Sequence, residues 1–131
     1  MAFLIKAFHV YSLETEDKYL FDTYNCELIE KSSEEARQGS AYLIEYPYIP
    51  EAEVMEAFIK AQNDRRIDSY FRGVELPAMF WNVFESGEFE RVAEYRRFEL
   101  RYLLDRLEAW LDENGIPHYC DHEDDRLKEV L

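Results

Sequence analysis

The chain has 131 residues, of which 47% are hydrophobic and 16% aromatic, and its formal net charge is −14 at pH 7. This length and apolar content favour one packed domain and exclude a disordered chain. The negative charge repels nucleic-acid phosphates and anionic membrane surfaces, and no apolar run reaches the roughly 18 residues that a membrane span needs. We therefore expect a soluble, cytoplasmic protein that binds neither nucleic acid nor membrane.

The first half of the chain combines a predicted hairpin with short elements. Residues 2–13 are compatible with a helix, because apolar side chains recur at helical spacing, or with a strand; we predict a short helix. Residues 18–30 look like a β-hairpin in which Asn25 can adopt the left-handed turn conformation. Ser32 and Glu35 have capping-box spacing, which predicts a short helix that Gly39 ends. Residues 41–46 could add a third strand.

Four helices are predicted in the second half. Pro50 suits the first position of one helix, and Asn63 with Asp64 can cap the next. A third helix opens at Pro77, and the longest covers about residues 88–114. The sequence therefore predicts a mainly helical α+β fold, in which a small antiparallel N-terminal hairpin or three-stranded sheet packs on about four helices. Residues 1–117 would form a single globular domain, followed by an acidic C-terminal tail at 118–131 that contributes little to folding.

The long helix has two apolar faces when it is read at about 100° per residue. The main face contains Phe89, Val92, Ala93, Leu100, Leu103, Leu104, Leu107, Trp110 and Leu111. A narrower aromatic stripe on the opposite side consists of Tyr95, Phe98 and Tyr102. We expect the N-terminal segment and the hairpin to cover this aromatic stripe, which favours a monomer over a homodimer. An uncovered stripe would be an interaction surface.

Two arginines are candidates for structural ion pairs. Arg96 falls within the main apolar face, so we expect a buried guanidinium with a carboxylate or carbonyl partner. Arg72 is the second candidate, and an ion pair of either residue could hold two helices together.

The densest cluster of potential metal ligands runs from His118 to Asp125. In an extended segment, His118, Cys120 and His122 would share one side, and zinc accepts these ligands. The cluster lacks the two spaced ligand pairs of structural zinc sites, and a solvated acidic tail is the alternative. We therefore expect no cofactor, although zinc could bind here. The chain contains no Gly-rich phosphate loop and no nucleophile elbow.

Several motifs between about residues 19 and 116 carry a family resemblance. They are Tyr19-Leu20-Phe21-Asp22 with Glu27-Leu28-Ile29, Tyr48-Ile49-Pro50 with Val54-Met55-Glu56-Ala57-Phe58-Ile59, Arg72-Gly73, Tyr95-Arg96, Trp110-Leu111, and Asn114-Gly115-Ile116. In these motifs the chain resembles an uncharacterised bacterial family of unknown function, one of the catalogued UPF families. Cys26 stands near a hairpin position where that family commonly has Gly, and residues 74–81 lack its basic aromatic run. The resemblance implies a fold and a bacterial-type cytoplasm, but no activity.

Three functional hypotheses follow from these features. The leading one is a non-catalytic interaction or regulatory module, because catalytic motifs are absent while aromatic residues and surface charge are in excess. Its protein partner is unidentified and could be basic. The second is a metal-dependent enzyme that uses the His118–Asp125 cluster. The third is an acidic decoy that occupies a basic, nucleic-acid-binding protein.

Overall fold

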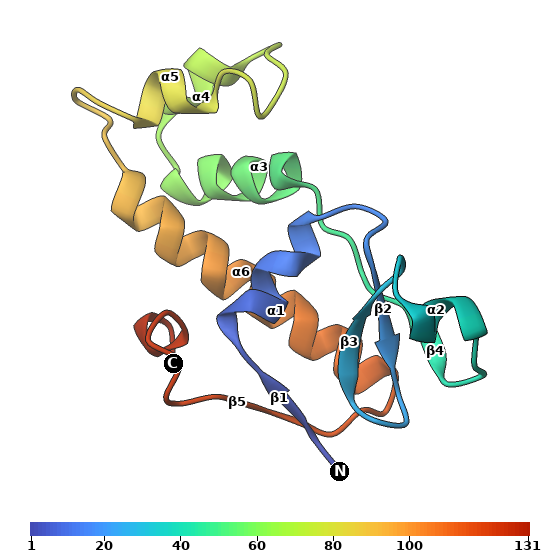
Figure 1. Cartoon of the computed structure of the whole chain (residues 1–131). Coiled ribbons are helices and arrows are strands. Elements are labelled where there is room, and N and C mark those ends of the chain that lie inside the picture. Colours follow the sequence, from blue (N-terminus) through green and yellow to red (C-terminus); the bar gives the residue numbers. More distant parts are fainter.

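A computed structural model describes all 131 residues and has a mainly helical α+β fold, as the sequence predicts. Helix α6 (Val92–Glu113) runs through the middle of the molecule (Figure 1). The antiparallel sheet lies beside the C-terminal end of α6, and α4 and α5 lie beyond its N-terminal end. No helix has both the length and the apolar character that crossing a membrane requires.

The N-terminal segment changes from strand to helix at Lys6, so the prediction of one helix over residues 2–13 is wrong. Strand β1 (Phe3–Ile5) precedes α1 (Ala7–Tyr11), and a 3₁₀ turn follows at Ser12–Glu14. Lys6 has an extended backbone and caps α1. The strand forms because β1 pairs in parallel with β5 (His118–Cys120), a partner far away in the sequence.

The predicted hairpin and third strand are confirmed. Strands β2 (Tyr19–Asp22), β3 (Glu27–Glu30) and β4 (Leu43–Glu45) form an antiparallel sheet in the order β3-β2-β4. The left-handed turn residue is Cys26, with φ of 53°, rather than Asn25. Asn25 instead donates hydrogen bonds to the Asp22 carboxylate from its backbone N and from Nδ2.

Helix α2 (Glu34–Gln38) connects β3 to β4 and packs against β3. Its cap is Ser33, whose hydroxyl accepts a hydrogen bond from the Ala36 amide at 3.2 Å, and not Ser32. Gly39 ends the helix with φ of 70°, as predicted.

The remaining predicted helices are present with shifted boundaries. They are α3 (Glu51–Gln62), α4 (Arg65–Phe71), α5 (Phe80–Phe84) and α6, which begins four residues later than expected at Val92. Pro50 caps α3 instead of occupying its first turn, and Asp64 caps α4 by accepting a hydrogen bond from the Arg66 amide.

The core surrounds α6 on two sides. Leu100, Leu103, Leu104, Leu107 and Leu111 are almost fully buried, and α1 and α3 both pack against this helix. Trp110 contacts Phe21 of β2 and thereby joins the sheet to α6. Ala93, which was assigned to the main apolar face, is exposed.

The C-terminal segment belongs to the same packed unit, so the predicted boundary at residue 117 is wrong. Strand β5 pairs in parallel with β1. A 3₁₀ turn at Leu127–Glu129 places the Leu127 side chain in the core with 0% exposure. The Asp124 carboxylate accepts a hydrogen bond from the Ala7 amide at 2.9 Å. This segment therefore caps the start of α1 and closes one side of the core.

Candidate functional site

The aromatic stripe on α6 is covered within the chain, but its aromatic contacts come from α3 and α5 rather than from the N-terminal segment or the hairpin. The Phe58 ring of α3 contacts the rings of Tyr95 and Phe98 at centroid distances of 5.2 and 5.3 Å. The Tyr102 hydroxyl donates a hydrogen bond to the Glu53 carboxylate of α3 at 2.7 Å. This covering leaves no aromatic stripe open to a partner.

Phe98→Asp should therefore unfold the domain, because it places a carboxylate against Phe58 inside a packed helix pair. We expect a loss of about 3 kcal/mol in the free energy of unfolding. A thermal melt followed by circular dichroism measures this loss, with Arg97→Asp on the exposed side of α6 as the control. A wild-type dimer that becomes a folded Phe98→Asp monomer in light scattering would contradict this assignment.

The charge buried along α6 is Glu99, and not Arg96 as predicted. The Glu99 side chain is only 4% exposed, whereas that of Arg96 is 53% exposed and lies over the Trp81 ring at 5.0 Å. The two residues form an ion pair at 3.1 Å within the same helix. Arg72, the other candidate, makes no ion pair, so neither arginine joins two helices by an ion pair.

The buried Glu99 lies next to Glu14, which is half-buried. Oε2 of Glu14 is buried and has no hydrogen-bond partner, and Glu99 is the charged group with the largest influence on it. Burial first, and then the charge and hydrogen bond of Glu99, raise the pKa of Glu14 to about 8, although Arg96 opposes the shift. At neutral pH Glu14 therefore holds its proton.

A carboxyl pair of this kind can in principle perform acid–base chemistry. Here the Glu99 residue is 3% exposed and Oε2 of Glu14 is buried, so a substrate does not reach the space between the two carboxyl groups. Burial together with Glu99 and Glu14 also raises the pKa of Tyr95, whose buried hydroxyl has no hydrogen-bond partner. We conclude that this pair affects stability and its pH dependence.

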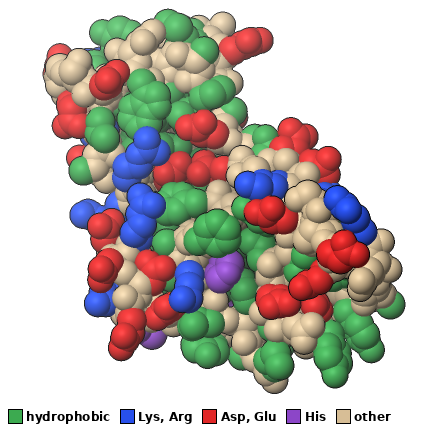
Figure 2. Space-filling model, viewed as in Figure 1, with side chains coloured by type: hydrophobic (Ala, Val, Ile, Leu, Met, Phe, Trp, Pro, Cys, Tyr) green, Lys and Arg blue, Asp and Glu red, His purple; other side chains and the backbone are tan.

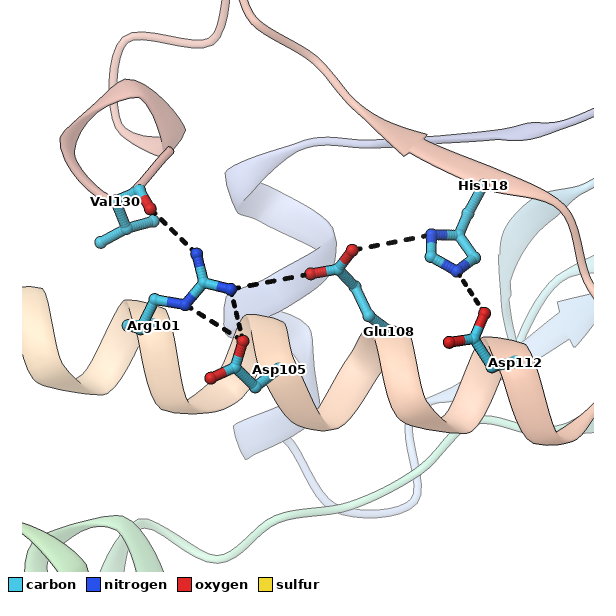
Figure 3. A network of polar contacts seen from close by, with 6 residues as sticks. All are labelled: Arg101, Asp105, Glu108, Asp112, His118 and Val130. Carbon is cyan, nitrogen blue, oxygen red and sulfur yellow. Dashed lines mark hydrogen bonds and ion pairs between the residues drawn. The ribbon is translucent and has the colours of Figure 1, made fainter.

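His118 takes part in a polar network between β5 and α6 (Figure 3). Its Nε2 lies 2.8 Å from Asp112 Oδ1, and its Nδ1 lies 3.9 Å from Glu108 Oε2. Arg101 lies 4.0 Å from the same Glu108 carboxylate and donates a hydrogen bond to the Val130 carbonyl at 2.9 Å. The network therefore fastens the C-terminal segment to α6.

The predicted metal ligands are not brought together. His118 and Cys120 are both on β5, but His122 follows the strand and is exposed. Asp112 and Glu108 face opposite edges of the His118 ring, so the three side chains cannot bind one ion together. No group of three or more His, Cys, Asp or Glu side chains anywhere in the structure could hold a metal ion. Burial and the nearby Glu108 carboxylate raise the pKa of Cys120, and Arg101 opposes this shift. The thiol is therefore not activated as a nucleophile or a metal ligand.

A different candidate lies at the sheet end of the molecule, where four exposed carboxylates have no ion-pair partner. We call these the acidic hairpin surface, and they are Glu27, Glu30, Glu34 and Glu35. Lys31 pairs with Asp17 and Glu45, and Lys18 and Arg37 are the cations of this region that make no ion pair. Acidic side chains outnumber basic ones on the face shown in Figure 2, including the side of the molecule that carries the sheet.

Comparison with known proteins adds no relationship to these observations. No family model, no curated protein and no solved structure matches the chain. The functional interpretation therefore depends on the geometry and charge of the residues described above.

Proposed function

We propose that the chain is a non-catalytic interaction module that binds a basic segment of a partner protein through the acidic hairpin surface. The observation that supports this proposal is the set of four exposed carboxylates without an ion-pair partner, in a chain of net charge −14. Clustered charge of this kind attracts and orients an oppositely charged partner, and salt screens the attraction. An acidic decoy of a nucleic-acid-binding protein would use the same surface.

Two variants with equal charge separate this surface from the general negative charge. The first replaces Glu27, Glu30, Glu34 and Glu35 by Gln. The matched control changes four exposed acids without ion pairs elsewhere, as Asp68→Asn, Glu75→Gln, Glu85→Gln and Glu113→Gln. Circular dichroism checks that both variants stay folded, since Glu34 and Glu35 also favour the first turn of α2.

The probe is a labelled peptide rich in Lys and Arg, and its binding is measured by fluorescence anisotropy. We expect the hairpin variant to bind about tenfold more weakly than the wild type, because four surface charges each contribute a few tenths of a kcal/mol. The control variant should keep most of the affinity. Equal weakening in both variants would mean that the peptide responds only to net charge, and would overturn the assignment to this surface.

A further inference from the structure

A pocket of 260 Å³ lies between α2 and the outer face of the three-stranded sheet. Ile29, which is 6% exposed, and Leu43 provide apolar side chains from the sheet. Glu35 and Gln38 border the pocket from α2. The pocket thus combines an apolar lining with the unpaired carboxylate of Glu35, which it shares with the acidic hairpin surface.

Two tyrosine rings lie together at this pocket. Tyr24, from the hairpin turn, and Tyr42, which precedes β4, are 67% and 53% exposed. Their ring centroids are 5.2 Å apart with an interplanar angle of 41°. The Tyr42 carbonyl accepts hydrogen bonds from both the backbone N and Oγ1 of Thr23, each at 2.9 Å, so the two turns are joined by the backbone. The exposed aromatic faces are therefore held in place next to the pocket, where they can attract a cation.

Asp22 adds a buried negative charge to the same pocket. The residue is 7% exposed, lines the pocket, and has no cationic partner in the chain. It accepts hydrogen bonds from the Tyr24 amide, the Asn25 amide and Asn25 Nδ2 at 2.9, 3.1 and 2.8 Å. Burial opposes its ionisation, but these hydrogen bonds outweigh burial and lower the pKa of Asp22, which keeps the carboxylate charged.

A carboxylate can accept about four hydrogen bonds, so Asp22 retains capacity for one further donor. Buried charges in proteins are normally paired with an opposite charge. The turn hydrogen bonds keep Asp22 charged, and a cation that enters the pocket would add the opposite charge that the chain does not place there.

Resting on the proposed function, we infer that this pocket binds one arginine side chain of the basic partner. The methylene stem lies against Ile29 and Leu43, and the guanidinium contacts the faces of Tyr24 and Tyr42 near Asp22 and Glu35. Arginine fits this site better than lysine, because its planar guanidinium stacks on aromatic rings and is less strongly hydrated than an ammonium group.

The test compares two short basic peptides that differ at one central residue, arginine in one and its neutral analogue citrulline in the other. Tyr42→Ala removes one aromatic face and keeps the backbone carbonyl that Thr23 uses, whereas Tyr42→Phe keeps the face. Tyr119→Ala, at an exposed tyrosine on β5, is the control. Titration calorimetry with the full chain gives each affinity.

For the arginine peptide we expect Tyr42→Ala to lower the affinity about fivefold, while Tyr42→Phe and Tyr119→Ala bind like the wild type. The citrulline peptide should bind the wild type about fivefold more weakly and be insensitive to Tyr42→Ala. Equal effects on both peptides would mean that the pocket takes an uncharged side chain, and would overturn the inference. Wild-type binding that Tyr42→Ala leaves unchanged would refute the pocket but not the proposed function. Absence of binding by either peptide would refute both.

Discussion

Glu14→Gln is expected to stabilise the protein at pH 8 and to have little effect at pH 4.5. The pKa of Glu14 is raised from its ordinary 4.5 to about 8 in the folded state, so between these values the folded chain holds a proton that the unfolded chain releases. Stability therefore falls as pH rises through this window. Glutamine keeps a donor for Glu99 and removes the titration. We expect a gain of about 2 kcal/mol at pH 8, a figure that allows for the partial exposure of Glu14.

The measurement is urea unfolding of wild type and Glu14→Gln at several pH values from 4.5 to 8.5. Glu16→Gln is the control, because Glu16 is exposed and lies in the same segment. The difference between Glu14→Gln and the wild type should increase with pH, whereas Glu16→Gln should follow the wild type. A wild-type stability that increases across this range in parallel with Glu14→Gln would show that Glu14 is ionised in the folded protein.

Leu127→Ala is expected to destabilise the protein by about 3 kcal/mol, although it lies four residues from the end of the chain. Its side chain is fully buried, and the surrounding segment is fixed by the β1–β5 pairing, by Asp124 and by Arg101. This loss is the sum of two free-energy terms, the transfer free energy of the methyl and methylene groups that are removed and the cost of the cavity that they leave. Deleting residues 118–131 should be more damaging, because it also removes β5.

Thermal and urea melts of Leu127→Ala measure this effect against Lys128→Ala, whose side chain is 57% exposed. We expect the control to melt like the wild type. If Leu127→Ala and the truncated chain both melt within a few degrees of the wild type, the C-terminal segment is a dispensable tail, as its composition alone indicated.

Local signals in the sequence predicted most of the secondary structure. The apolar and β-branched residues around Tyr19 and Ile29, separated by a polar turn, give the hairpin. Gly39 ends α2 because a residue with positive φ is needed at that position. Gly115 follows the end of α6 with a positive φ of 66°, and Pro117 cannot continue a helix. In these cases the information lies within a few residues of the element.

The errors concern contacts between distant parts of the chain. Residues 3–5 have an apolar pattern that also fits a helix, and only their pairing with residues 118–120 makes them a strand. Because β5 lies within the predicted acidic tail, the same pairing makes this segment part of the folded domain. Neither outcome follows from local propensity, because the stabilising hydrogen bonds join segments more than 110 residues apart.

The sequence contains a signal for the burial of Glu99. Tyr95, Glu99 and Leu103 are spaced by four residues, so they lie on one side of α6 and all three are buried. Arg96 has nearly the same angular position as Leu103 and Leu107, but it lies in the second turn of α6, where its long side chain extends over Trp81 and reaches solvent. Angular position alone therefore does not distinguish the buried from the exposed charge.

The pocket at the hairpin could not be predicted, because it is assembled by the sheet. Tyr24 and Tyr42 are distant in sequence, and they meet because β4 pairs with β2. Asp22 likewise pairs with Leu43 of β4 and lines the same pocket as Glu35 and Gln38 of α2. Its hydrogen bonds to Asn25 have a local signal, since an Asp before a polar turn commonly accepts bonds from the turn amides.

The most direct test of the interaction surface is to map where a basic peptide binds. Amide chemical shifts of the labelled protein are followed while an arginine-containing peptide is added. We predict the largest changes within residues 22–45, centred on Tyr24, Glu35 and Tyr42, and almost none around Glu85 or Glu113. Changes that are spread evenly over the acidic residues, or that are largest away from the hairpin and α2, would contradict the account.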